Sequence, residues 1–421
     1  VSEIGESAFR NTSCQFEVDE NNPNFTVKDG ILFSKDMKTL ISSHAIARDD
    51  YYVSATVEKI CDSAFYRSCY RKIFLPKNLK HIGNYAFESM ENMQSIRIPQ
   101  TVTHIGYCAF KDTPNLKMID VDTNNQFYAS IYGQLYSKDL KTLIAVPAAI
   151  NIFELLDEQN SIDLTVFHFC DFAFSNFKTP FEVDIPDGVE SIGNNCFENS
   201  YILSISIPAS VTNIGHLAFA CCTFLAVITV DKDNPNFASE DGVLFSKDMT
   251  TLLFYPRNKP NESYIIPPSV THISPWAFYE CGCLHMLTIS PNVKYLPYEC
   301  VQSLPGLTNL VLQEGLRAIG INCFSHTGIV HLVIPSTVNS IGHCAFLECH
   351  ELEYVEISAS VSFIAKTAFI GCPKLRCIYV NPNNLKYASF DKALFTKDLK
   401  TLLRFPPNSK ITSYSIPKTV E

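Results

Sequence analysis

A short phrase of sequence returns along this chain at a nearly fixed interval, and that repetition limits the folds open to it. In the clearest copies Ile-Gly is followed, after two residues, by Ala-Phe, as at residues 105–110, 214–219 and 341–346. Most neighbouring Phe positions are 22 or 23 residues apart. The full set, with Val in one copy, is Phe9, Phe65, Phe87, Phe110, Phe174, Phe197, Phe219, Phe278, Val301, Phe324, Phe346 and Phe369. A period of 20–29 residues with apolar residues at fixed offsets is typical of leucine-rich repeats.

A second phrase, Leu-x-x-Ile-x-Ile-Pro, lies between the Phe positions, as at residues 95–99, 204–208 and 331–335. The alternation of apolar residues predicts a short strand with one buried face, which Pro ends because it cannot donate to a strand ladder. One such coil is too small to bury its own apolar face, so we expect neighbouring coils to stack at about 4.8 Å per strand. The Phe would fill the space between coils, and the Gly four residues before it would permit the tight backbone that turns the coil.

Four inserts interrupt this pattern, near residues 18–46, 121–147, 230–256 and 380–406. Each contains a Leu-Phe or Leu-Tyr pair, then Ser or Thr, then Lys-Asp, and a Thr-Leu pair follows shortly after. We interpret each insert as a β-hairpin that turns around Lys-Asp and widens a coil without ending the array. The segment 148–169 fits no copy and is predicted to bulge from its coil.

The predicted fold is therefore a right-handed leucine-rich-repeat solenoid, rich in β-structure and with little helix. Its coils are 22–23 residues long, and its parallel strands lie on the concave face. We expect residues 1–421 to form a single continuous array whose two ends are cut within repeats.

The combined string Ile-Gly-x-x-Ala-Phe-x-x-Cys-x-x-Leu-x-x-Ile-x-Ile-Pro is similar to the BspA-like (Treponema pallidum type) leucine-rich repeats. Its Cys, three residues after the Phe, is present as Cys222, Cys281, Cys349 and Cys372. The resemblance covers essentially the whole chain, with Val301 in place of Phe and Ser290 in place of Pro as departures. It implies a surface protein of a mucosal protist such as Trichomonas, or of a bacterium. Such proteins mediate adhesion to host matrix proteins, host cells or other microbes.

Charge and hydropathy argue against two classes of partner. The chain has 33 Lys and Arg against 43 Asp and Glu, a net charge of −10, so it lacks the basic surface that nucleic acids need. The uncharged stretch 201–230 is interrupted by Ser, Pro, Asn and His, and is therefore not predicted to span a membrane. We expect no nucleic-acid partner and no membrane span within this segment.

Nine of the 16 cysteines recur at three fixed offsets from the Phe position, which favours free thiols that pack as small buried apolar groups. Disulfides between adjacent coils, Cys300 with Cys323 and Cys349 with Cys372, remain an alternative. No Cys-x-x-Cys pair is present, so neither a metal nor another cofactor is predicted.

Four Cys–His neighbours could suggest a nucleophile, but sequence adjacency is not catalytic geometry. They are Cys170 with His168, Cys323 with His326, Cys344 with His343, and Cys349 with His350. Each lies at a repeat position that other copies fill with inert residues, and no catalytic sequence motif is present. We therefore predict that the protein is not an enzyme, and a cysteine hydrolase is the alternative.

The residues that alternate with the buried Ile pair should point outward from the strands. In the C-terminal half they are unexpectedly apolar and aromatic, and they form the candidate ligand-binding site on the predicted concave face. These residues are Met286, Val311, His331, Val333, Tyr354, Glu356 and Tyr379. An exposed apolar patch with Tyr is typical of a protein-binding surface. Shelter by a hairpin insert, or strand propensity alone, would also account for these residues.

Together these features predict a cell-surface or secreted module that binds proteins, namely host matrix or cell-surface glycoproteins or other microbial surfaces. Asn-x-Ser/Thr glycosylation signals at Asn11, Asn24 and Asn261 lend weak support to secretion. The alternative is an intracellular protein–protein interaction scaffold with the same coil.

Overall fold

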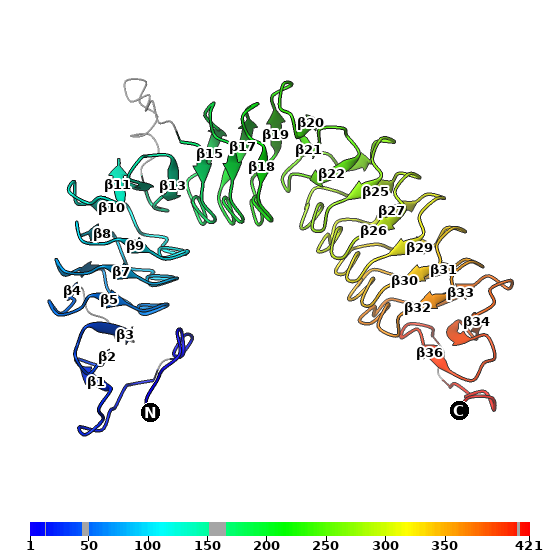
Figure 1. Cartoon of the computed structure of the whole chain (residues 1–421). Helices are drawn as coiled ribbons and strands as arrows, with labels where there is room; N and C mark the ends of the chain where they lie inside the picture. The colour runs from blue at the N-terminus through cyan, green and yellow to red at the C-terminus, as the bar shows by residue number, and fades with distance from the viewer. Residues whose placement is uncertain (13, 44–49, 151–165, 411–412) are drawn as a thin grey trace. The chain divides into compact units, whose positions relative to one another are not determined.

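The computed structural model describes residues 1–12, 14–43, 50–150, 166–410 and 413–421, and these residues form strands and turns without any helix. The chain divides into two compact units, which are described separately. The first comprises Val1–Ile202 and Pro208–Thr223, and the second comprises Leu203–Ile207 and Phe224–Glu421. Within each unit successive coils stack and their strands line up in ladders (Figure 1). The segment predicted to bulge, 148–169, lies largely outside the described residues.

In the first unit the strands of the Ile-x-Ile phrase form a parallel sheet. They are β6 (Lys72–Phe74), β8 (Ser95–Ile98) and β10 (Met118–Val121). β4 (Asp50–Tyr52), which lacks the phrase, pairs in parallel with β6 at the edge of this sheet. Ile73 pairs with Ile96, and Ile96 with Ile119, and all three side chains are buried. β15 (Phe181–Asp184) carries the same phrase farther along the chain. The strand prediction is confirmed, because the inward Ile column is continuous from coil to coil.

Two-residue strands before the Gly form a second parallel ladder in this unit. One run contains β5 (Lys59–Ile60), β7 (His81–Ile82) and β9 (His104–Ile105), and the other contains β14 (His168–Phe169), β16 (Ser191–Ile192) and β18 (Asn213–Ile214). Each of these coils thus contributes a short strand to the second ladder, whereas the coil of Phe9 contributes no strand.

The second unit repeats both ladders. The Ile-x-Ile strands are β17 (Ile202–Ile207), β19 (Val227–Val230), β23 (Ser263–Ile265), β25 (Met286–Ile289), β27 (Asn309–Leu312), β29 (His331–Val333), β31 (Tyr354–Ile357) and β33 (Cys377–Val380). The short strands are β24 (His272–Ile273), β26 (Tyr295–Leu296), β28 (Ala318–Ile319), β30 (Ser340–Ile341) and β32 (Phe363–Ile364).

The Phe column forms the aromatic core between coils. Phe87 is fully buried between Phe65 and Phe110, with ring centroids 5.5 Å apart on each side. In the second unit Phe346 is stacked in the same way between two rings, at 5.4 Å on each side. Ten of the twelve repeat positions are buried, including Val301. Phe9 and Phe174 are only half-buried, so the expectation of a buried wedge is wrong at those two positions.

The repeated Gly has a different role from the one expected. A Cβ on Gly106 would lie 2.4 Å from the backbone nitrogen of Asn84 in the preceding coil, and φ of Gly106 lies outside the left-handed region. The Gly therefore permits close approach of neighbouring coils rather than a special turn of its own coil. Cys61, Cys170 and Ser274 occupy this position in the coils that follow a hairpin. Pro297 and Ala365 occupy it in two coils that follow an ordinary coil, so the Gly is not invariant.

Each insert forms three antiparallel strands. They are β1 (Phe25–Lys28), β2 (Ile31–Ser34) and β3 (Thr39–Ser43); β11 (Tyr128–Ile131), β12 (Gln134–Ser137) and β13 (Thr142–Ala145); β20 (Phe237–Glu240), β21 (Val243–Ser246) and β22 (Thr251–Phe254); and β34 (Tyr387–Phe390), β35 (Ala393–Thr396) and β36 (Leu402–Arg404). The Lys-Asp turn is held by side chains. In the third insert Lys247 Nζ donates to the carbonyl of Lys232 at 2.6 Å, and Asp248 accepts from Ser246 Oγ at 2.6 Å.

The inserts also divide the sheets. The amide of Ile119 donates to the carbonyl of Gly133 at the tip of the second insert, and the amide of Ile378 donates in the same way to Lys392 in the fourth. These contacts occupy the edge of β10 and of β33, so the Ile-x-Ile sheet ends there. The last strand of an insert starts the other ladder, since Leu143 of β13 pairs in parallel with Phe169 of β14. That the whole chain forms one continuous array stays a prediction.

Candidate binding surface

The outward residues of β25, β27, β29, β31 and β33 form what we call the unit 2 strand face. Alternation along each strand places Leu332, Val355 and Ile378 in the core, and the residues on either side of them therefore point the other way. The face is thus a direct consequence of the period-two pattern in the sequence.

Five of the seven predicted site residues lie together on the sheet β29–β31–β33. His331 pairs with Tyr354, and Glu356 lies opposite Val333 on one side and Tyr379 on the other. Val333, Tyr354 and Tyr379 are 51%, 42% and 49% exposed, which is high for large apolar side chains. No hairpin shelters them, so apolar surface remains open to water on three adjacent strands.

A polar pair crosses this apolar surface. The His331 Nε2 atom lies 3.0 Å from Glu356 Oε1, and the His331 ring meets the Tyr354 ring edge to face at 6.1 Å. The contacts limit the positions that the Tyr354 ring can adopt. A ring held in place loses less conformational entropy when a partner binds it.

The other two predicted residues are less available. Met286 and Val311 lie on β25 and β27 of the neighbouring sheet and are half-buried. Thr288, which alternation also places outward, is only 6% exposed because it lies between Ile265 and Val311 in the pairing register. Position in the repeat therefore did not predict exposure at this end of the face.

A second surface was not singled out from the sequence. We call the outward residues of β4, β6, β8 and β10 the unit 1 strand face. There Tyr52 and Phe74 stack at 4.4 Å with their planes 6° apart, and they are 69% and 41% exposed. Tyr52 was missed because β4 lacks the Ile-x-Ile phrase. Asp50 precedes its pairing partner Lys72 by one 22-residue period, and that spacing could have revealed the strand.

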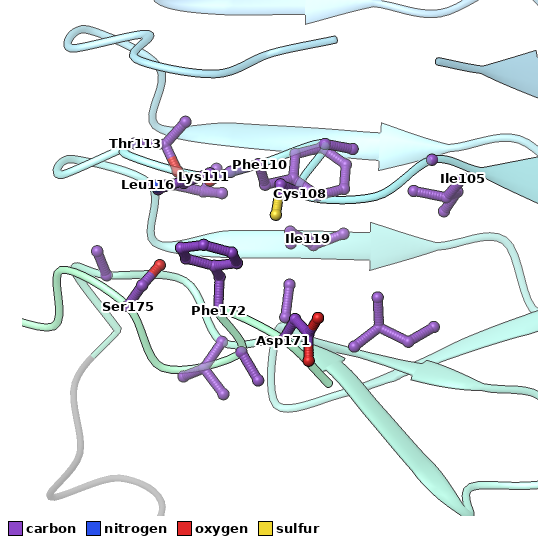
Figure 2. A pocket seen from close by; sticks show the side chains of 17 residues that line it. Ile105, Cys108, Phe110, Lys111, Thr113, Leu116, Ile119, Asp171, Phe172 and Ser175 are labelled. Atoms are coloured by element: carbon purple, nitrogen blue, oxygen red, sulfur yellow. Dashed lines mark hydrogen bonds between the residues drawn. The ribbon is translucent and has the colours of Figure 1, made fainter. Parts of the chain in front are cut away.

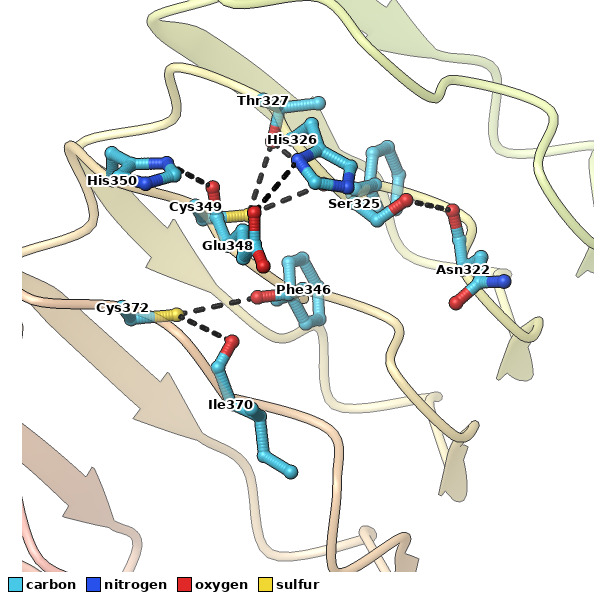
Figure 3. Close-up of polar contacts among 11 residues, drawn as sticks. Asn322, Ser325, His326, Thr327, Phe346, Glu348, Cys349, His350, Ile370 and Cys372 are labelled. Carbon is cyan, nitrogen blue, oxygen red and sulfur yellow. Dashed lines mark hydrogen bonds and ion pairs between the residues drawn. The ribbon is translucent and has the colours of Figure 1, made fainter.

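The thiols near histidines are not arranged as nucleophiles. Cys349 and Cys372 donate from Sγ to the carbonyls of Phe324 and Phe346, each at 3.2 Å, as Figure 3 shows for Cys372. The two histidines beside Cys349 contact Glu348 instead: His326 Nδ1 lies 3.3 Å from its carboxylate, and His350 Nδ1 lies 2.6 Å from its carbonyl oxygen (Figure 3).

Two further cysteines next to a histidine, Cys170 and Cys323, are not arranged as nucleophiles either. His168 Nδ1 contacts Ser191 Oγ at 2.9 Å, and burial raises the pKa of the Cys170 thiol to about 11. Burial also raises the pKa of Cys323, whose Sγ lies 3.4 Å from that of Cys300 without a disulfide between them. Since the thiolate is the reactive form, the raised pKa values make Cys170 and Cys323 poor nucleophiles at neutral pH. Cys349 differs, because its hydrogen bond with Cys372 lowers its pKa.

A small, partly open cavity lies in the first unit where the coil of Phe110 meets Phe172 (Figure 2). Its volume is about 40 Å³, which is room for a few water molecules and not for a substrate. Lys111 Nζ lies 4.1 Å from the Phe172 ring centroid, and burial raises the pKa of the Cys108 thiol in the wall to about 12. The cavity therefore has no activated group.

Within the described ranges, no group of three or more His, Cys, Asp or Glu side chains is placed to hold a metal ion. The part of the chain that the structure covers also contains no helix long and apolar enough to cross a membrane.

Comparisons with known proteins agree with this fold. The family model described as "BspA type Leucine rich repeat region (6 copies)" matches residues 50–147, 149–246, 252–376 and 317–420. No curated protein sequence matches the chain.

Among solved structures, a leucine-rich cell surface protein of Faecalibacterium prausnitzii is 21% identical with a TM-score of 0.55, and the match covers 86% of this chain and 96% of that one. A leucine-rich repeat protein of Eubacterium ventriosum is 20% identical with a TM-score of 0.47, covering 83% and 93% of the two chains. The first of these likenesses shows a shared fold and nothing further.

Proposed function

Because the chain belongs to the BspA-type leucine-rich-repeat family, we propose that it is a non-catalytic module that binds proteins through the unit 2 strand face. The observation that carries this proposal is the exposure of Val333, Tyr354 and Tyr379 on adjacent strands. Tyr side chains bury a large area with few rotatable bonds, so they make efficient anchors for a protein partner. A contiguous apolar patch open to water is otherwise unfavourable in a soluble protein.

The partners in this proposal are host matrix proteins, host cell-surface glycoproteins or the surfaces of other microbes. The module would then act at the cell surface or after secretion. The F. prausnitzii protein, which shares the fold, is described as a cell surface protein. The similarity of the repeat string to adhesive surface proteins supports the same assignment.

Direct binding measurements test the proposal. The full chain is applied to immobilised matrix glycoproteins and to intact host or microbial cells. Changing Tyr354→Ala together with Tyr379→Ala should weaken binding by at least about tenfold, since buried aromatic anchors carry much of the energy of an interface. The matched control is Phe363→Ala, an aromatic of similar exposure (51%) on β32 of the other ladder. Unchanged binding by a folded double variant would remove the assignment.

The compartment is tested separately on protein isolated from its native host. Asn24 is exposed, and Asn261 is half-buried, next to the exposed Glu262 and Ser263; the third signal at Asn11 includes residue 13, which lies outside the described residues. Glycan at Asn24 or Asn261 supports passage through a secretory pathway. Unglycosylated, fully reduced protein would favour the intracellular scaffold instead.

A further inference from the structure

The unit 1 strand face differs in chemistry from the face proposed to bind proteins. Tyr52 and Phe74 present two parallel, stacked rings, and the next two strands carry charged outward residues: Arg97 on β8 and Asp120 on β10. Two aromatic groups thus lie next to two charged groups over adjacent strands.

Phe74, Arg97 and Asp120 line an open groove rather than a flat patch. It runs over β6, β8 and β10 with a volume of about 590 Å³, which falls in the range of small-ligand sites. Phe74 and Leu75 provide apolar wall, and Gln100, Asp120 and Asp122 provide hydrogen-bonding groups. An amphipathic ligand can satisfy both kinds of wall, whereas a purely apolar one would leave the polar groups unpaired.

The lining of the groove has an excess of positive charge, because Lys72, Lys77 and Arg97 face only Asp120 and Asp122. Arg97 is shared between Asp120 and Asp122, at 3.6 Å and 3.7 Å. Lys72 and Lys77 line the same groove, and among the described residues neither has a carboxylate within 4.0 Å. Asp50 lies opposite Lys72 in the strand register, so part of this charge is balanced on the neighbouring strand. The remaining positive excess beside an aromatic ring attracts an anion, even though the whole chain carries a net charge of −10.

From this arrangement we infer that the unit 1 strand face binds an acidic carbohydrate, a sugar bearing a carboxylate or a sulfate. The C–H face of a sugar ring packs against Phe74, its hydroxyl groups exchange hydrogen bonds with Gln100 and the Asp side chains, and its anionic group lies near Lys72 and Lys77. This site is independent of the proposed protein-binding face, because the residues that form the two sites belong to different units.

Titration calorimetry on the full chain tests this inference with three defined probes: a trisaccharide ending in N-acetylneuraminic acid, a sulfated disaccharide, and lactose as the neutral counterpart. At least one acidic probe should bind at least about tenfold more tightly than lactose. The two acidic probes distinguish a carboxylate from a sulfate. Binding should weaken as salt rises, because the lysines are exposed to screening.

Variants locate the site. Phe74→Leu keeps an apolar side chain but removes the ring face, and should weaken the acidic probe by about tenfold. Lys72→Gln with Lys77→Gln should abolish the preference for the acidic probe over lactose. The matched control, Tyr354→Ala with Tyr379→Ala on the other unit, should leave sugar binding unchanged.

Three results would overturn the inference. They are no binding of either acidic sugar at millimolar concentration, equal binding of lactose, and acidic-sugar binding that survives both sets of variants in folded protein. Preferential binding of a Glu-rich peptide over both acidic sugars would equally reject a carbohydrate ligand. Failure here leaves the protein-binding proposal intact, since that is measured on other residues.

Discussion

The two strand faces share one repeat but expose different chemistry. Their inward residues are nearly interchangeable, as Ile73 and Ile96 in the first unit are matched by Leu332 and Val355 in the second. The outward residues of the unit 1 strand face are a stacked aromatic pair beside charged groups. Those of the unit 2 strand face are separate Val and Tyr side chains around a His–Glu pair. Stacking constrains only the inward half of each strand, so the outward half is free to differ between copies.

The largest expected effect concerns what the two units share. Phe87→Ala in the first unit and Phe346→Ala in the second should each lower the free energy of unfolding by about 3–5 kcal/mol, because both rings are fully buried between two stacked neighbours. Denaturant unfolding measures both losses. A loss near zero for either variant would show that the aromatic core is not equivalent in the two units.

A smaller effect distinguishes how tightly the coils approach. Gly106→Ala should cost about 1–3 kcal/mol, because its Cβ would lie 2.4 Å from a backbone nitrogen of the preceding coil. Gly342→Ala in the second unit should cost less, since its nearest atom is 2.8 Å away. Gly282→Ala, with nothing within 4 Å, is the control. Thermal unfolding measures the three losses of stability. Equal losses for all three would contradict the close-approach role of the Gly.

In both units a tyrosine of a hairpin insert should stabilise the last strand of the ladder of two-residue strands to the same extent. The Tyr128 hydroxyl accepts from the amide of Ile105, and the Tyr387 hydroxyl accepts from the amide of Ile364, both at 2.8 Å. Removing either hydroxyl by substitution with Phe leaves that amide without its acceptor and should cost about 1 kcal/mol. Faster hydrogen exchange at Ile105 or Ile364 is the local measurement, and unchanged exchange would count against the contact.

The smallest effect leaves stability unchanged and concerns thiol chemistry. Burial raises the pKa of Cys170 to about 11, so its thiolate fraction is low at pH 8 and should rise about tenfold per pH unit until that pKa is reached. Alkylation followed by mass spectrometry should therefore label the exposed Cys69 well before Cys170. Labelling of Cys170 at the rate of Cys69 at pH 8 would contradict its burial.

Much of the fold could be predicted from residue spacing. The inward Ile columns, the Phe stack and the hairpin at each Lys-Asp turn are local patterns, and each has the predicted form in the structure. Phe9 and Phe174 were wrongly expected to be buried, because position in a repeat does not say what covers it. β4 and Tyr52 were missed because their strand lacks the repeat phrase.

The candidate binding surface was predicted only in part. Alternation identified His331, Val333, Tyr354, Glu356 and Tyr379 as outward, and the structure places them on one sheet. Alternation also marked Thr288 as outward, although Ile265 and Val311 cover it. The charged groove beside Phe74 could not be recognised, since it depends on side chains from three coils.

The sequence alone therefore determined which residues are repeated, which side of each strand is apolar and where the inserts enter, because these follow from periods of 2 and about 22 residues. Only the tertiary structure decided which outward residues reach water and which pair across strands. It also showed that the repeated Gly lies against the backbone of the preceding coil. These outcomes depend on the register of one coil against the next, and that register is set by packing between residues more than 20 positions apart.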